Sequence, residues 1–539
     1  MTNQEMLRLV SRDFGAPVIA WVCNLSKEEA QSLAAGDLPL DGIRSQILDR
    51  LVQALFSLRV QAAIEGAPVH LLLSQLSLAQ GSADRNILNV WREEASGTLP
   101  NIVTDDKVAE PLQHLALDAY PNLLMAPYLL RRWDAGGMMM HSTFSFRHPA
   151  RKRFEAAILE DEALTLLFPT KGQNGISTFG YVTASTGTGG SLQLVGLAAQ
   201  MIQCAYALMR MRGQLSVEEL CNSTHEVIDL IRKACVGKAV KLPTFVGFNN
   251  VALEVSSPIQ LPWGTLRPYT QAFSEFIPSE AGPSHFIDNG TDVTLGVVLE
   301  TDFPYEIRVE PWAPGPPIDD IPIWPSNTER WRAEFEHNCR LTSLALSLAI
   351  ERDPPVATAL AWVMRLDPLF SSNSVSWRSA AYPPFDPFVL KEDSAASISR
   401  WASAIAAVDD AGIRIAQQRI VGALAQRHDP ADSFIDAVVA WENLYGSGEG
   451  ELTFRISVSM ASLLSEDSDE RLAVQREIAA LYGRRSKVLH GDTDPSPRDA
   501  TRDRDRALSL VLATLRRLYQ DFPELISQKD RGKLIVLRL

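Results

Sequence analysis

Apolar residues at helical spacing, separated by strong helix stops, fill the last quarter of this 539-residue chain. The segment Asp-Pro-Ala-Asp at 429–432 interrupts the pattern, and glycines at 446 and 491 end two of the apolar stretches. The predicted helices cover about 397–427, 434–446, 454–464, a stretch that ends at 491 and a stretch that ends near 521. Five helices with short connections predict a helical bundle.

The fourth predicted helix ends in an arginine and histidine pair. Residues 481–491 read Leu-Tyr-Gly-Arg-Arg-Ser-Lys-Val-Leu-His-Gly, so four residues separate Arg485 from His490. Arginine binds phosphate through charge-assisted hydrogen bonds, and histidine moves protons near neutral pH. On a continuing helix the two side chains would lie roughly 140° apart. A helix end at Gly491 would allow His490 to turn back toward Arg485, and such a pair suits RNA cleavage.

The spacing alone is a weak signal, because Arg332 and His337 repeat it among glutamates and without a following glycine. Two interpretations of the C-terminal pair therefore stay open. In one, Arg485 and His490 act on RNA. In the other, Arg485 pairs within the bundle with Glu442, and His490 is an ordinary helix-end residue that satisfies carbonyls.

The order of the helices, Trp-Glu-Asn-Leu at 441–444 and the 481–491 motif resemble the HEPN family, most closely its Apea-like branch, over about residues 395–525. The resemblance implies an HEPN-type bundle and a metal-independent endoribonuclease, commonly a toxin or antiviral effector, whose arginine and histidine motif acts across a dimer interface. By the same resemblance Arg485 and His490 are catalytic. The supporting residues are Arg484 as a second candidate arginine, Glu442 as an acidic partner, and Ser486 and Lys487 within the motif.

One helix departs from the family pattern. The stretch 454–461 has serine about where related sequences often carry another arginine. Arg455 either replaces that arginine from a different face or is solvated.

The chemistry can also be derived from RNA itself, which carries its nucleophile as the 2′-hydroxyl. Cleavage requires that its proton be removed, that the phosphate charge be stabilised and that the leaving oxygen be protonated. One histidine cannot both hold and lack the proton, so one motif per chain is half a site. A two-fold dimer would bring two copies of His490 and Arg485 to one axis.

Charge permits an RNA partner at one end of the chain. Residues 480–539 contain 13 Lys and Arg against 8 Asp and Glu, whereas the whole chain carries a net charge of −14. A strongly acidic body argues against broad, nonspecific nucleic-acid binding, which depends on phosphate contacts. The alternating charges at 498–506 indicate a solvated helix start with internal ion pairs.

The rest of the chain predicts an α+β multidomain protein. Short apolar runs at 17–22 and 69–73 beside a helical pattern at 42–64 indicate α/β or α+β structure in the N-terminal part. Strands are expected at 251–255, 294–299 and 305–309, the last two as a hairpin across 301–304. Proline-rich stretches at 311–325 and 383–387 suggest boundaries. The predicted domains are 1–140 (mixed α/β), 141–325 (mixed α+β), 326–390 (connecting) and 391–539 (HEPN-like bundle).

Other features favour ordinary structural roles. The five cysteines are scattered, which predicts reduced thiols, and no cofactor or metal is expected. Glycines at 187–190 before an apolar helix suggest a flexible turn more than a phosphate cradle. His141 and His148 lack a neighbouring ligand set. The apolar stretch 192–209 favours a buried helix over a membrane span, and without a secretion signal a cytoplasmic location is expected.

Two functions follow as hypotheses. The preferred one is a homodimeric or higher homo-oligomeric endoribonuclease, acting in phage defence, whose N-terminal region answers a phage-derived trigger or a regulatory partner. The alternative is a noncatalytic protein whose bundle dimerises or binds a partner.

Overall fold

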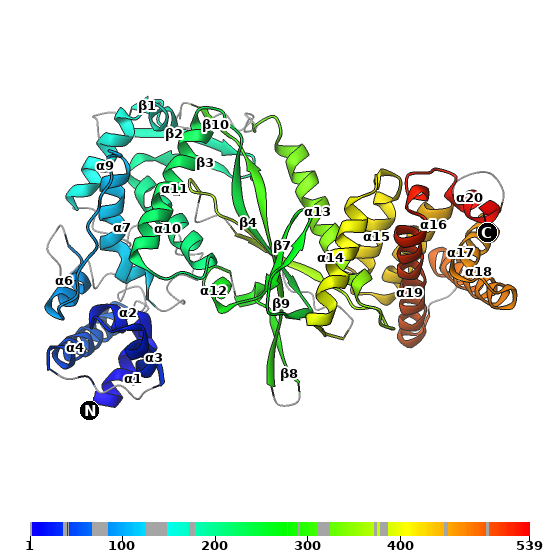
Figure 1. Cartoon of the computed structure of the whole chain (residues 1–539), viewed down its shortest axis with the longest axis horizontal. Helices are drawn as coiled ribbons and strands as arrows, with labels where there is room; N and C mark the ends of the chain where they lie inside the picture. The colour runs from blue at the N-terminus through cyan, green and yellow to red at the C-terminus, as the bar shows by residue number, and fades with distance from the viewer. Residues whose placement is uncertain are drawn as a thin grey trace.

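Figure 1 shows a computed structural model of the chain. It describes residues 3–35, 40, 42–66, 85–125, 148–171, 178–277, 279–288, 291–310, 324–370, 375–377, 386–446, 451–491 and 495–538. Its described part is a mixed α+β structure that ends in a helical region. The central sheets lie between the N-terminal helices and this C-terminal helical region (Figure 1).

Among the residues that the structure describes before residue 126, helices are the only regular secondary structure. Its helices are α1 (Asn3–Phe14), α2 (Ala16–Val22), α3 (Lys27–Ala35), α4 (Gly42–Glu65), α6 (Ile87–Glu94) and α7 (Ala109–Leu123). The expected mixed α/β character of residues 1–140 is therefore wrong for the described residues. The apolar run 17–22 forms α2, because its proline fits the first helical turn and Val18, Ile19 and Val22 are buried. The run 69–73 lies outside the described residues.

Two antiparallel sheets form the middle of the molecule. The smaller one contains β1 (Thr170–Lys171), β2 (Thr178–Ala184), β3 (Gly189–Gln193) and β10 (Ile307–Glu310). The larger one has the order β12 (Val375–Trp377), β11 (Ala359–Arg365), β4 (Val240–Asn249), β9 (Thr291–Tyr305), β7 (Gly264–Pro268) and β6 (Ile259–Leu261), and β8 (Ser284–Asp288) pairs with β9. A short parallel pair joins β5 (Val251–Glu254) to β13 (Phe388–Lys391).

The strand expected at 251–255 is β5, but the hairpin expected across 301–304 is wrong. Strand β9 runs through these residues, paired with β4, and β10 then pairs with β2 in the other sheet. Pro304 is tolerated because β7 pairs with β9 no further than Glu300, so the proline lies beyond that pairing. The proline-rich stretch is described only from residue 324 onward and 383–387 only from 386, and the predicted domain boundaries stay predictions.

The longest apolar stretch forms a core helix. Helix α10 (Leu194–Met211) is long and apolar enough to cross a membrane by length and composition alone, but 72% of it is buried in the protein. It packs with α11 (Val217–Cys235). Gly187 lies in the turn between β2 and β3, where it has a φ of 84° and donates to the Ala184 carbonyl, and Gly189 and Gly190 begin β3. The expected turn is confirmed.

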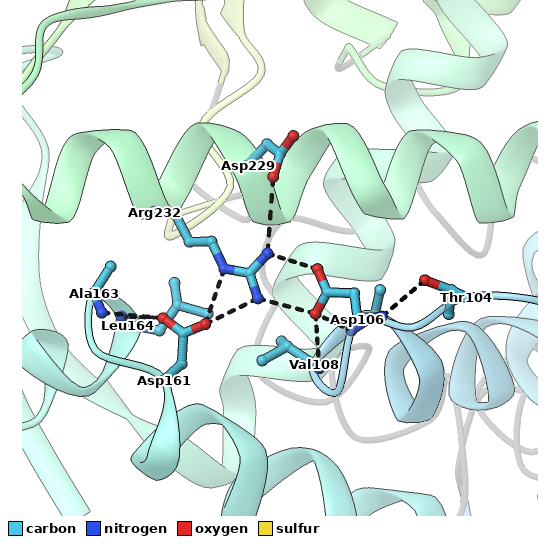
Figure 2. A network of polar contacts seen from close by, with 9 residues as sticks. Thr104, Asp106, Val108, Asp161, Ala163, Leu164, Asp229 and Arg232 are labelled. Carbon is cyan, nitrogen blue, oxygen red and sulfur yellow. Dashed lines mark hydrogen bonds and ion pairs between the residues drawn. The ribbon is translucent and has the colours of Figure 1, made fainter.

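Arg232 on α11 joins three segments of this region (Figure 2). Its guanidinium pairs with Asp106, just before α7, at 2.6 Å and with Asp161, at the end of α9 (Pro149–Glu160), at 2.9 Å. Asp106 also accepts backbone hydrogen bonds from Val108 and Ala109. The hydrogen bonds from Arg232, more than those from the backbone, lower the pKa of Asp106 to about 2. The cluster therefore holds α11, the end of α9 and the segment before α7 together.

The C-terminal helical region follows β13. Its helices are α14 (Glu392–Ala406), α15 (Arg414–Ala425), α16 (Pro430–Tyr445), α17 (Leu452–Leu464), α18 (Ser468–His490), α19 (Pro497–Asp521) and α20 (Arg531–Arg538). Asp429 caps α16 through the Ala431 amide, and the predicted helix ends at Gly446, Leu464, Gly491 and Asp521 are confirmed.

The single helix expected over 397–427 is wrong, because the chain breaks between α14 and α15. At this break the Asp410 carboxylate lies 2.9 Å from Nε2 of His337 on α13 (Thr328–Ala349). Burial alone would raise the pKa of Asp410, but the hydrogen bond and charge of His337, with Arg414 and Gln417, lower it to about 2. Arg332 and His337, which repeat the spacing of Arg485 and His490, thus have different partners, because Arg332 pairs with Glu329 at 3.2 Å.

Helix α19 ties the helical region to α13. The Arg516 guanidinium donates to the carbonyls of Ser347, Leu348 and Ile350 at the C-terminal end of α13, at 3.0–3.2 Å. A cation at this end of a helix is favoured by the helix dipole and satisfies carbonyls that lack helical partners. The position of the C-terminal helices is therefore fixed by specific contacts to the rest of the molecule.

Candidate functional site: the C-terminal end of α18

Helix α18 carries the arginine and histidine motif and is mostly exposed. Asp467 starts it by accepting from the Asp469 and Glu470 amides at 2.9 Å, and Gly491 ends it with a φ of 74°. Of its 23 residues, all described, only Ile478 and Leu481 are buried. The predicted glycine stop is confirmed, and the apolar side chain of Leu489, two residues before it, is 49% exposed. One face of the helix packs against the rest of the protein, and most of its remaining surface is exposed to solvent.

Arg485 lies against Glu442 of α16 and Tyr482 of its own helix. The shortest arginine–carboxylate distance is 3.4 Å, and the Tyr482 hydroxyl donates to Glu442 at 2.6 Å. Burial, then the hydrogen bond to Glu442 and that carboxylate's charge, raises the pKa of Tyr482 to about 12, so the phenol keeps its proton at neutral pH. The side chain of Arg485 is 17% exposed, and its Nε is buried with no hydrogen-bond partner among the described residues. Arg485 is therefore loosely paired and retains unused donor capacity.

Arg484 points to a different neighbour. Its guanidinium makes two hydrogen bonds to the buried Asp503 carboxylate on α19, at 2.6 and 3.1 Å. This pair closes α18 against α19 and gives Arg484 a structural role. Lys487 is exposed and Ser486 half-buried, and Lys487 joins Arg484 in lining a pocket of about 280 Å³ between α16, α18 and α19.

His490 is exposed, and among the described residues it has no hydrogen bond or ion pair. The helix continues through His490, so within one chain Arg485 and His490 project roughly 140° apart. The expected return of His490 toward Arg485 does not occur. The structure thus brings Glu442, Tyr482 and Arg485 together and leaves His490 facing solvent.

The other sequence candidates have structural roles. Arg455 donates to the Gly446 carbonyl at 2.7 Å and so holds the end of α16. His148 begins α9 by accepting from the Ala150 amide, and His141 lies outside the described residues. Over 498–506 the expected ion pairs form, but Asp503 and Arg504 are buried, so this helix start is only partly solvated. Within the described ranges no three His, Cys, Asp or Glu residues gather to hold a metal ion.

Two contributors escaped sequence reasoning. Tyr482 has its role through a hydrogen bond to another helix, although a tyrosine three residues before an arginine on the same helix is a usable signal. Arg531 is 2% exposed and donates to the carbonyls of Leu444, Leu525 and Ile526 at 2.6–2.9 Å. It fixes the end of α16 close to Glu442, and no local pattern marks it.

No protein-family model, no curated protein and no solved structure matches the chain.

Proposed function

We propose that the C-terminal helical region is an HEPN-type endoribonuclease that cuts RNA without a metal ion and works as a homodimer. The observation that carries the proposal is the state of Arg485. Unlike Arg484, it has a weakly held carboxylate partner and a buried Nε donor with no partner in the described structure. A phosphate group beside the exposed part of this side chain would gain a charge-assisted contact that the weak pair with Glu442 does not prevent.

The mechanism divides the chemistry between two side chains. Arg485, oriented by Glu442, would stabilise the charge on the phosphate. His490, exposed at the helix end, would move protons to and from the ribose and the leaving oxygen. Since these side chains diverge within one chain, a complete site would need a second chain.

The surface of α18 supports a partner helix. Gly483 lies seven residues before His490, so the two share a face to within about 20°. Gly483 is exposed, and a side chain there would meet nothing within 4 Å. Ala479 and Ser486 fall on the same face, so a second copy could approach the helix closely. The N-terminal part would restrain this nuclease or answer a phage-derived trigger.

One observation favours the alternative, a noncatalytic scaffold. Both motif arginines already have carboxylate partners in the same chain, Arg484 with Asp503 and Arg485 with Glu442. If those pairs only hold α18 in place, the region would dimerise or bind a partner without cutting RNA.

Cleavage of labelled total RNA by the purified full chain, in the presence of EDTA, separates the two functions. We expect cleavage that falls at least about 100-fold in Arg485→Ala and in His490→Ala, the usual loss for an electrostatic or proton-transfer group. The matched controls are Arg330→Ala and His428→Ala, at exposed positions on α13 and before α16. Equal cleavage by all variants would show that the activity does not come from this motif. If the full chain cuts no RNA, either by itself or with extract from phage-infected cells added, the result supports the noncatalytic scaffold.

A further inference from the structure

A cavity of about 560 Å³ lies where the large sheet meets the helical region. Strand β11 contributes residues between Ala359 and Arg365 to its wall, and α13 and α15 each contribute one helical face. Its volume is in the range of sites for small organic ligands. The cavity lies apart from the α18 motif, since no residue of α16, α18 or α19 lines it.

Arg365 is the unusual member of the wall. Its guanidinium carbon lies 4.8 Å from the Phe303 ring centroid and 5.1 Å from that of Phe335, so the cation packs beside this pair of aromatic rings. Its Nε is buried without a hydrogen-bond partner, and no described carboxylate forms an ion pair with it. Asp367, two residues away, is committed to Tyr305 and to the Leu369 and Phe370 amides. A buried cation without a counterion is costly unless a ligand supplies one.

A second arginine reinforces the positive charge. Arg340 on α13 lines the same cavity, is half-buried and pairs with no described carboxylate. The one acidic lining residue, Glu336, is exposed and leaves the wall with an excess of positive charge. Around the two arginines stand Ser376, Gln418 and Gln426, which offer neutral donors and acceptors.

Trp377 adds an aromatic surface. It lines the cavity on β12, and 43% of it is exposed. We infer that this cavity binds a small organic anion whose phosphate or carboxylate group lies between Arg340 and Arg365. Because β11 and α15 both line the cavity, the anion would bridge the sheet and the C-terminal helices.

Isothermal titration of the full chain tests this with three probes of similar shape. UMP carries a phosphate, orotate carries a carboxylate, and uridine has the planar base without an anionic group. The protein carries Arg485→Ala, so that the proposed nuclease site contributes no binding. We expect UMP or orotate to bind at least about tenfold more tightly than uridine, and the better anion identifies the acidic group.

The same titration in Arg340→Gln should weaken the better anion about tenfold or more, since one charge-assisted contact is lost. Arg330→Gln, an exposed arginine on the same helix, should bind like the parent. Arg365→Met is titrated as a second variant if its circular dichroism shows a folded protein. If that variant does not fold, the comparison between Arg340→Gln and Arg330→Gln decides the test. Failure of both anions to bind, or equal binding in Arg340→Gln and Arg330→Gln, would overturn the inference. Neither result depends on RNA cleavage.

Discussion

Two neighbouring arginines on α18 have different environments, and this difference is what a mutational study can use. Arg484 makes two short hydrogen bonds to a buried carboxylate, whereas Arg485 lies 3.4 Å or more from a half-buried one. The strong pair stabilises packing between helices, and the weak pair can be rearranged at little cost. Arg485, which makes the weaker contacts within the fold, is therefore the better candidate for a catalytic residue.

Glu442→Gln tests whether that weak pair positions Arg485. The substitution removes the negative charge but keeps an oxygen for the Tyr482 hydroxyl. We expect kcat for RNA cleavage to fall about tenfold, with little change in KM, because Arg485 loses its orienting charge. The free energy of unfolding should change by less than about 1 kcal/mol, since the pair is long and partly solvated. Glu451→Gln, at an exposed position before α17, is the matched control. A loss of stability with unchanged cleavage would assign Glu442 to the fold alone.

At this scale the sequence predicted the partner of Arg485 but not the whole site. Glu442 was identifiable as a possible partner, and the structure places it there. The roles of Tyr482 and Arg531 depend on contacts to other segments, and Arg365 acquires its position from pairing between distant strands. Such contacts leave no local pattern in one sequence.

At the scale of elements, local chemistry predicted helix ends better than helix continuity. Asp429, Gly446 and Gly491 act through their own backbone and near neighbours, so their effects are readable from the chain. The break near Asp410 was missed because its partner, His337, comes from a distant helix. The run 17–22 was misread because a short, wholly apolar segment fits a buried strand as well as a buried helix.

Gly483 gives a prediction for α18 in which stability and assembly change in opposite directions. A glycine inside an exposed helix is unfavourable, so Gly483→Leu should raise the free energy of unfolding of the monomer by up to about 1 kcal/mol. If a second copy packs on this face, the added side chain should abolish the dimer and cleavage with it. Denaturation followed at low concentration and sedimentation velocity measure the two effects.

Gly483→Ala is the control for that variant, because it gains the helical preference with a side chain small enough for close packing. Leu472→Ala at the other end of the same helix reports on a general effect of changing an exposed α18 residue. A stabilised Gly483→Leu protein that remains dimeric and active would place the dimer interface elsewhere.

At the scale of the whole molecule, helices α13 and α15 connect the two candidate sites. The α13 helix lines the anion cavity with its middle and receives Arg516 of α19 at its C-terminal end. Helix α15 lines the same cavity and packs on α16, which carries Glu442. A ligand that changes the packing of α13 and α15 would therefore act on α19 and α16, which pack against these two helices. Both α19 and α16 contact the motif helix α18 directly.

The composite site makes a quantitative prediction for mixed assemblies. If each site needs His490 from both chains, equal amounts of wild type and His490→Ala that exchange freely should retain about one quarter of the activity, because only that fraction of random pairs is wild type in both chains. Independent sites would retain about half. Exchange is verified by co-purification of untagged wild type with tagged variant. Mixing with His428→Ala in place of His490→Ala should leave the activity undiminished, since that exposed histidine lies outside the motif. Retention of half the activity after verified exchange would mean that each site needs only one His490, supplied either by the same chain as Arg485 or by the partner chain, and would exclude a site that needs both histidines.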